Sequence, residues 1–453
     1  MTSSAPSSLL DPLFGTTEVA AFLDDRARLQ GMLDFEAALA RAEAAVGVIP
    51  AAAAEPIAAR CRAELFDLAA LGEAAALAGN PAIPMVKRLT ALVAETDETA
   101  ARYVHWGATS QDAMDTGLVL QLRACLVLLE ADLDRLEVAL ADLARRHRDT
   151  LMVGRTWLQQ ALPLTFGLKA AGWLDAVLRH HERLRALRPR LLVLQFGGAV
   201  GTLASLGGRG LEVTRALAQQ LDLAVPDLPW HAHRDRLAEL AAWLGLLAGS
   251  LGKMARDLAL LMQTEVAEAF EPAAPGKGGS STMPHKRNPV GAAVVLSAAI
   301  RAPGLVATLL AAMPQEHERG LGGWHAEWQT LPELALLAAG ALRRMVEIVE
   351  GLEVDPVAMR AGLETTRGLI MAEAVQMALG AKLGRQQAHA LLERATKRAV
   401  AEGRDLGEVL RAMPEIVAEL SAPELDRLLD PATYTGEAGT FVDRALAARE
   451  RGA

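Results

Sequence analysis

The sequence predicts an all-α protein built around a bundle of long helices, and three observations support this prediction. The 453 residues are 51% hydrophobic but only 4% aromatic, so small and aliphatic side chains supply most of the apolar content. No sustained strand-like alternation and no Asn-Gly hairpin turn is present. A leucine repeats at alternating spacings of four and three, the heptad pattern of helices packed side by side: Leu122, Leu126, Leu129, Leu133, Leu136, Leu140 and Leu143.

Two further segments fit this helical prediction. Residues 28–46 have amphipathic periodicity that is stopped by Gly47 and Pro50, which indicates a helix ending there. The run from Val290 to Met313 is apolar enough to imitate a membrane span. Because Arg301 and Pro303 stand in the middle of it, we expect instead a helix buried on all sides of a large bundle, and no membrane.

Interruptions in the helical periodicity divide the chain into three predicted domains. Breaks fall near residues 105–107 and near residues 364–368. We therefore expect an N-terminal helical domain over 1–106, a central long-helix bundle over 107–365 and a C-terminal helical domain over 366–453.

The composition limits the kinds of binding partner and the cellular compartment that we expect. A formal charge of −9 with no basic stripe argues against nucleic acid as a partner. Two cysteines, Cys61 and Cys125, cannot form a disulfide framework, and no Cys/His spacing indicates a zinc site. The first twelve residues lack a basic region followed by an apolar core, so we expect a cytoplasmic protein.

A polar loop from Gly278 to Pro289 stands out in this apolar chain. It combines glycines, adjacent hydroxyls, two cations and two prolines, and loops are where a rigid scaffold usually places its chemistry. Asn288 followed by Pro289 predicts a helix N-cap and first helical residue, whose free N–H groups would favour an anion. The alternative is a mobile, solvated connector, which does not require this combination of residues.

From Gly279 to Pro289 the loop resembles the signature of the fumarase/aspartase superfamily, Gly-Ser-Ser-x-Met-Pro-x-Lys-x-Asn-Pro, at every fixed position. The resemblance implies a three-domain, all-helical fold whose central bundle assembles into the core of a homotetramer. It implies active sites shared between subunits, and carbanion chemistry next to a carboxylate. It implies no metal ion and no organic cofactor.

A second segment, His105 to Asp112, places Thr109 and Ser110 after a glycine and before a long helix. Hydroxyls and N–H groups at a helix start bind carboxylates well, although Ser110 could equally be a simple N-cap. Adenylosuccinate lyase and its relatives have a similar Gly-x-Thr-Ser-x-Asp segment that holds a substrate carboxylate. The resemblance implies that His105 lines the site, while a lone histidine is often only structural.

A third segment, residues 154–167, resembles the lyases' Arg-Thr-His-x-Gln-x-Ala-x-Pro-x-Thr-Phe-Gly, but Trp157 stands in place of the histidine. In the lyases that histidine is assigned to protonating the leaving group, and an indole cannot act as a general acid. A carboxylate leaving group needs no such acid, since its conjugate acid has a pKa of about 4.

A reaction that remains possible without this general acid is the addition of a carboxylate to an alkene within one molecule. Segments 25–36 and 317–328 resemble the bacterial lactonising cycloisomerases of the superfamily, which act on a tricarboxylate from protocatechuate breakdown. We therefore expect a lactonising cycloisomerase with a small tricarboxylate substrate. The alternatives are an adenylosuccinate-lyase-like β-elimination that produces fumarate, and a catalytically silent helical scaffold, which the intact signature loop disfavours.

The resemblance assigns a role to each candidate residue. Ser280 would exchange the proton next to a carboxylate, and Lys286 and Asn288 would stabilise the enolate-like dianion. What activates Ser280 stays open, and neighbouring His285 is one candidate. The expected substrate-binding residues are His105, Thr109, Ser110, Trp157, Gln159, Ser281 and Arg319.

Two of these residues have structural alternatives. Arg319 would clamp a carboxylate, since a guanidinium suits bidentate binding, but it could instead pair with Glu316 or Glu318. Gln159 would orient another carboxylate, but it could instead satisfy backbone groups in a turn.

Overall fold

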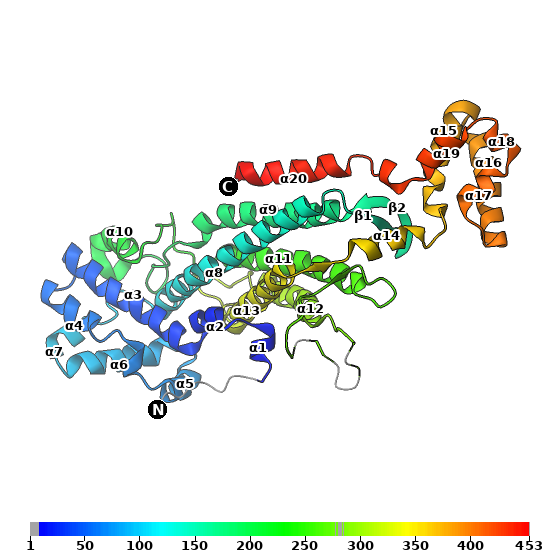
Figure 1. Cartoon of the computed structure of the whole chain (residues 1–453). Helices are drawn as coiled ribbons and strands as arrows, with labels where there is room; N and C mark the ends of the chain where they lie inside the picture. Colours follow the sequence, from blue (N-terminus) through cyan, green and yellow to red (C-terminus); the bar gives the residue numbers. More distant parts are fainter. Residues whose placement is uncertain (1–8, 277, 280–282, 284, 453) are drawn as a thin grey trace. The chain divides into compact units, whose positions relative to one another are not determined.

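The computed structural model describes residues 9–276, 278–279, 283 and 285–452, and this part of the chain is mostly helical (Figure 1). The chain divides into two units. The first comprises Met1–Leu133, His180–Gly252 and Val294–Arg344, and the second comprises Asp134–Arg179, Lys253–Ala293 and Met345–Ala453. The boundaries of the three domains predicted from the sequence remain a prediction.

Five long helices contribute residues to both units: α8 (Ser110–Arg146), α9 (Phe166–Leu191), α11 (Asp235–Leu261), α12 (Val290–Ala311) and α13 (Gly323–Glu350). The other helices of the first unit are α1 (Asp11–Phe14), α2 (Thr17–Leu23), α3 (Asp25–Val46), α4 (Ala54–Ala58), α5 (Leu68–Ala78), α6 (Ala82–Ala94), α7 (Glu98–Ala101) and α10 (Gly210–Leu221), with 3-10 turns η1 (Ala51–Ala53), η2 (Ala63–Leu65) and η3 (Ala204–Arg209).

The second unit adds helices after α13 and two small sheets. The helices are α14 (Pro356–Glu364), α15 (Ala372–Leu383), α16 (Arg385–Glu402), α17 (Leu406–Arg411), α18 (Pro414–Val417), α19 (Ala422–Leu429) and α20 (Ala438–Gly452), with 3-10 turns η4 (Leu369–Met371) and η5 (Pro431–Thr433). The strands are β1 (Leu151–Thr156), β2 (Gln159–Thr165), β3 (Ala269–Phe270) and β4 (Glu353–Val354), paired antiparallel as β1–β2 and β3–β4.

The leucine stripe lies on α8, as the sequence predicts, and all seven of its leucines are buried. Helix α3 also confirms its prediction. The Asp24 side chain caps its start by accepting from the Ala27 N–H, and Gly47 ends it in the left-handed conformation with φ of 78°. Sequence periodicity and end signals therefore located these two helices correctly.

Close contacts hold the long helices together within the first unit. At Gly252 of α11, an added Cβ would lie 2.5 Å from Ala299 Cβ of α12, so that the two backbones approach as only small residues allow. Helix α9 meets α11 where His180 Nε2 lies 2.9 Å from Ser250 Oγ. Helix α13 is tied to α8 by a 2.8 Å contact from Arg343 Nε to Asp132 Oδ2.

The expectation that the apolar run after Pro289 is buried on all sides is wrong for the single chain. Helices α11 and α12 are both long and apolar enough to cross a membrane, by length and composition alone. Within α11, 61% of the most apolar window is buried, but within α12 only 28% is. Ile300 of α12 is 74% exposed. Helix α12 therefore presents an apolar face that the described part of this chain does not cover.

The β1–β2 hairpin departs from the all-α prediction. Thr156 pairs with Gln159 across a two-residue turn, in which Trp157 (φ 54°) and Leu158 (φ 64°) are both left-handed. Turns with two left-handed residues usually carry Asn-Gly, and because Trp157 and Leu158 stand here instead, no hairpin was predicted. Both turn residues are strained and exposed, Trp157 at 97% and Leu158 at 74%.

A buried ion cluster ties three segments of the first unit. The Arg234 guanidinium donates to Asp115 at 2.6 and 3.0 Å and to Glu327 at 2.6 and 2.9 Å. Burial alone would lower the pKa of Arg234, but the two carboxylates outweigh burial and raise it. Burial raises the pKa of Glu327, against the opposing effect of Arg234. The cluster therefore depends on its single cation.

Replacing that cation, as Arg234→Met, should destabilise the fold by about 3–5 kcal/mol near pH 8, because two buried carboxylates lose their partner. Those orphaned acids would have folded-state pKa values above their unfolded values. The penalty should therefore shrink between pH 8 and pH 5, as they take up protons. Guanidinium unfolding at the two pH values measures both effects.

The matched control is Arg394→Met, which breaks an exposed pair between Arg394 and Glu415. That change should cost less than about 1 kcal/mol at either pH. Equal costs for the two variants would contradict the role given to Arg234.

Candidate active site

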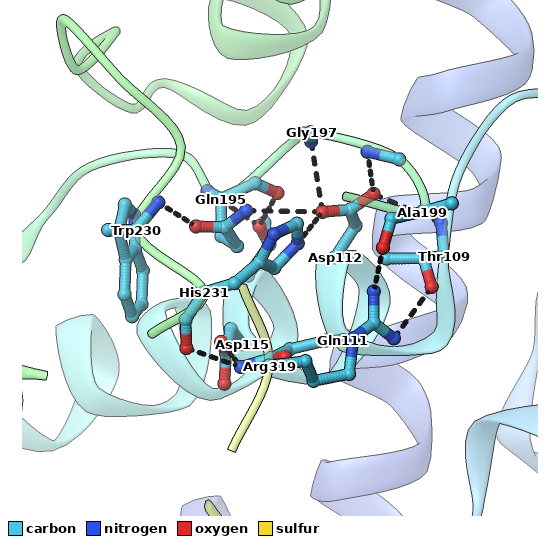
Figure 2. A network of polar contacts seen from close by, with 12 residues as sticks. Thr109, Gln111, Asp112, Asp115, Gln195, Gly197, Ala199, Trp230, His231 and Arg319 are labelled. Carbon is cyan, nitrogen blue, oxygen red and sulfur yellow. Dashed lines mark hydrogen bonds and ion pairs between the residues drawn. The ribbon is translucent and has the colours of Figure 1, made fainter. Parts of the chain in front are cut away.

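The carboxylate of Asp112, in the first turn of α8, organises one candidate site in the first unit (Figure 2). This side chain is fully buried. Its Oδ2 accepts from the N–H groups of Thr109 at 3.0 Å and Gly198 at 2.9 Å, and its Oδ1 accepts from the Gly197 N–H at 3.0 Å, from Gln195 Nε2 at 3.2 Å and from His231 Nε2 at 2.7 Å. One acid therefore fixes the loop before α8, the glycine-rich loop over 195–201 and the segment before α11.

The two loops touch directly through their glycines. Gly198 is left-handed, with φ of 69°, and a Cβ there would lie 3.0 Å from the Gly107 carbonyl oxygen. A larger residue at Gly198 would be strained in conformation and crowded by Gly107. Thr116 adds a second tether, because its hydroxyl donates to the Gln195 carbonyl at 2.8 Å.

Arg319 closes this arrangement, and it contacts Thr109 as well as the glycine-rich loop. Its Nη1 donates to Thr109 Oγ1 at 2.9 Å and its Nη2 to the Ala199 carbonyl at 2.8 Å. No ion pair of Arg319 with Glu316 or Glu318 occurs among the described residues, and Glu316 instead accepts from the Leu321 N–H at 2.8 Å. Arg319 and Thr109 thus present a guanidinium and a hydroxyl side by side, a combination suited to an anion.

Ser110 and His105 belong to the same loop. Ser110 is the first residue of α8 and is partly buried. His105 is left-handed, with φ of 58°, and its Nδ1 lies 2.6 Å from Glu36 Oε1 of α3. The four predicted residues of this region therefore lie on one short loop or bind to it.

Lys286 and Asn288 lie together on the signature loop of the second unit. The backbone N–H and the side-chain amide of Asn288 both donate to the Gly278 carbonyl at 3.1 Å, which closes the base of the loop. The Lys286 N–H donates to the Met283 carbonyl at 3.0 Å, and its side chain is exposed. Ser280 and Ser281 lie outside the described residues.

The helix that follows this loop begins at Val290, one residue later than predicted, and no contact in which the Asn288 side chain caps it occurs among the described residues. The buried Glu271 carboxylate accepts from the N–H groups of Gly291 at 3.0 Å and Ala292 at 2.7 Å. A protein carboxylate therefore occupies the helix N-terminus, where the sequence suggested a site for an external anion. Acidic side chains are preferred at the N-terminal end of a helix. Here the acid is Glu271, which is remote in sequence from the start of α12 and was therefore not predicted to cap it.

Arg287 anchors the loop next to Lys286. Its guanidinium binds Glu353 of β4 at 2.8 and 2.9 Å, donates to the Glu271 carbonyl at 2.6 Å and lies 4.8 Å from the centre of the Phe270 ring. The two neighbouring cations thus differ. Arg287 is used within the fold, whereas the exposed Lys286 side chain has no partner among the described residues.

Trp157 and Gln159 lie at the exposed tip of the β1–β2 hairpin. Gln159 pairs with Thr156 through the backbone, and its own side chain is exposed. The strand behind the tip is held by Arg155, whose guanidinium forks onto the buried Glu268 carboxylate at 2.8 and 2.6 Å. Strained residues on a well-anchored turn are typical of functional sites.

Sequence reasoning missed residues that hold the site of the first unit together. Asp112 was visible only as the last residue of the Thr-Ser segment, and the glycine-rich stretch over 195–201 was the one signal for its partners. His231 and Glu36 carry no local signal, because each meets its partner across 69 or more residues.

Comparisons with known proteins show the family of this chain. A family model described as "Lyase" matches residues 14–304, and one described as "Adenylosuccinate lyase C-terminus" matches residues 368–445. A 3-carboxy-cis,cis-muconate cycloisomerase of Pseudomonas aeruginosa is 62% identical, over 99% of this chain and 97% of that protein. One of Bradyrhizobium diazoefficiens is 57% identical, over 99% of this chain and 100% of that protein.

A solved structure shows the same fold. The crystal structure of the 3-carboxy-cis,cis-muconate lactonizing enzyme from Pseudomonas putida superposes with a TM-score of 0.94 at 57% identity, covering 98% of this chain and 100% of that one. Because the first family model spans more than half of the chain and the relatives match nearly all of it, the chain belongs to the lyase family of the fumarase/aspartase superfamily.

Proposed function

We propose that this chain is a cycloisomerase that converts 3-carboxy-cis,cis-muconate to a carboxymuconolactone in the protocatechuate branch of the β-ketoadipate pathway, in the cytoplasm. The observation that carries the proposal is identity of 57–62% over nearly the whole chain to cycloisomerases of this specificity. Trp157 supports it independently, since the tip that carries it offers no general acid for expelling an amine.

The reaction joins a carboxylate oxygen to the β carbon of an alkene within one substrate molecule. The alkene electrons move to the α carbon and give an enolate-like dianion. The α carbon then takes a proton from the Ser280 hydroxyl, or from a group that exchanges protons with Ser280. Lys286 and Asn288 would stabilise that dianion. Holding the nucleophilic carboxylate against the alkene supplies a large part of the rate.

The remaining candidates would bind the carboxylates of the substrate. Arg319 and Thr109 would bind one as a guanidinium–hydroxyl pair, which their 2.9 Å contact supports. Ser110, Ser281 and Gln159 would orient the carboxylates further. Trp157 would fill the space that a general acid occupies in the lyases.

A homotetramer with shared active sites completes the proposal. The apolar face of α12, with Ile300 74% exposed, supports burial against further copies of the chain. The exposed indole of Trp157 supports insertion of the hairpin tip into a site formed with another subunit. Each chain would then contribute its segments to different sites.

The decisive experiment follows the ultraviolet absorbance of 3-carboxy-cis,cis-muconate after purified protein is added, with the product identified by NMR. We expect rapid conversion to a carboxymuconolactone and no production of fumarate from adenylosuccinate. A folded protein that released fumarate from adenylosuccinate, and left the muconate unchanged, would overturn the proposal in favour of β-elimination.

Lys286→Met should lower kcat by about 10²–10³-fold, because a preorganised positive charge is lost at the developing dianion. Its unfolding midpoint should stay unchanged, since the side chain is exposed. Arg287→Met is the matched control. It should lower stability by about 1 kcal/mol through loss of the Glu353 pair, and it should spare most of kcat. Full turnover by the Lys286 variant would remove Lys286 from the mechanism.

Mixing two inactive proteins tests the shared sites. Ser280→Ala and Thr109→Ala alter different segments, so random mixed tetramers should regain about one quarter of the normal sites. The measurement is the cycloisomerase rate after unfolding and refolding the two together, against each refolded alone. Mixed tetramers, verified by mass spectrometry, that stay inactive would count against sites built from several chains.

A further inference from the structure

The histidine before the Thr-Ser segment is held in an unusual way. His105 adopts a left-handed conformation at φ of 58°, which is uncommon for a residue with a side chain and marks positions of function or strain. Its Nδ1 lies 2.6 Å from Glu36 Oε1, and the Glu36 side chain has no exposed surface. Because a carboxylate only accepts, Nδ1 carries the proton and donates it to Glu36.

The other ring nitrogen of His105, Nε2, is not used in the contact with Glu36. The His105 side chain is 17% exposed, and no partner for Nε2 occurs among the described residues. Four residues later in the same loop, Thr109 binds Arg319. The backbone of that loop is pinned by the Asp112 carboxylate at the Thr109 N–H. The ring therefore has one nitrogen anchored by a buried acid and one without a partner among the described residues, on the loop that carries Thr109.

We propose that Glu36 is a positioning residue that keeps His105 as an imidazolium, whose Nε2–H binds a carboxylate of the substrate. The inference rests on the proposed function and deepens it. The substrate carries three carboxylates, and Arg319 and Lys286 are the permanently charged cations among the candidate site residues. A charged His105 is the third, and it is a donor with a direction fixed by Glu36.

The charges around the ring favour this state. Burial by itself lowers the pKa of His105, but the Glu36 carboxylate outweighs burial through its charge and its hydrogen bond, and Asp112 adds to it, so the pKa of His105 is raised. Arg319 contacts the same loop at Thr109. Burial, with the charges of Glu36 and Asp34, raises the pKa of the nearby Cys61 thiol, and burial raises the pKa of Asp34.

Glu43 provides a second buried acid on α3, seven residues after Glu36. Neither of its oxygens has a hydrogen-bond partner among the described residues, and the side chain is fully buried. Burial, together with the Glu36 charge, raises the pKa of Glu43 to about 9. Glu43 is therefore neutral near pH 7, and of these two acids it is Glu36 that contacts His105.

This difference between two acids of one helix gives a matched pair of variants. Glu36→Gln removes a charge and leaves an oxygen to accept from His105, whereas Glu43→Gln replaces a neutral acid by a neutral amide of the same size. With Glu36→Gln, the pKa of His105 should fall. KM for 3-carboxy-cis,cis-muconate should then rise about tenfold at pH 8, as one charge-assisted hydrogen bond is lost, with a smaller change in kcat.

The pH dependence of kcat/KM tests the direction in which the pKa of His105 moves. A histidine with a raised pKa loses its charge as pH rises through that pKa, so the basic limb of kcat/KM should move to lower pH in Glu36→Gln. The increase in KM should shrink as the pH is lowered and the ring regains its proton. Glu43→Gln should leave the limb in place, although it too changes a buried side chain.

An NMR titration of the histidine ring carbons separates this inference from the proposed function. The chain has ten histidines, and a His105→Asn sample identifies the signal of His105. We expect its titration midpoint to fall in Glu36→Gln and to stay unchanged in Glu43→Gln, whether or not the muconate is turned over.

An unchanged midpoint in Glu36→Gln, or equal shifts in the two variants, would overturn the role of Glu36. A shifted midpoint with wild-type KM at every pH would overturn the contact between His105 and substrate. A shifted midpoint in a protein that never converts the muconate would uphold the anchoring of His105 by Glu36 and refute the proposed function.

Discussion

The carboxylate of Asp112 is the interaction on which the candidate site of the first unit depends. It stands in the first turn of α8, a helix fixed in place by its buried leucines. From there it satisfies the backbone N–H groups of Thr109, Gly197 and Gly198. Each buried N–H left without a partner would cost about 1–3 kcal/mol. The conformation of both loops is therefore set by one side chain on a rigid element.

A second charge centre lies one turn further along the same face of α8. Asp115 follows Asp112 by three residues, and Arg234 follows His231 by three, so the two centres share their elements. Gln111 Nε2 joins them, since it donates to Asp115 Oδ2 at 3.0 Å and to the His231 carbonyl at 2.9 Å. The segment before α11 is thus fixed on α8 at two points. Rotation of that segment would break the His231–Asp112 contact and the Arg234–Asp115 ion pair together.

The extent to which the sequence predicted this structure depends on how far apart the interacting residues are. The stripe on α8 and the end of α3 are local patterns, and both were confirmed. The β1–β2 hairpin was not predicted, because its turn uses Trp157 and Leu158 where left-handed conformations normally require Asn or Gly. Long helices can be inferred from periodicity, whereas strained turns cannot, because their strain is offset by contacts elsewhere.

The residues of the candidate site also fall into those that local sequence patterns identify and those that they do not. The signature loop and the Thr-Ser segment could be identified by resemblance, and Thr109 does meet Arg319 across 210 residues. The acids that hold these segments could not be found, since no spacing relates Asp112 to His231, or Glu271 to the start of α12. The apolar face of α12 was predicted to be buried, but helical periodicity cannot tell whether neighbouring helices of the same chain will cover it.

Buried acids recur wherever a candidate chemical group is presented. Glu36 holds His105, Asp112 holds the Thr109 loop, Glu268 holds the strand behind Trp157, and Glu271 holds the helix after Lys286. Each acid is almost fully buried, and each is stabilised by hydrogen bonds from the segment that it fixes. Some of the acidic residues of the chain are therefore buried and used to stabilise the fold. Those acids are already bound to structural donors. Among the described residues, Lys286 has no carboxylate partner, so its ammonium stays available for an anionic ligand.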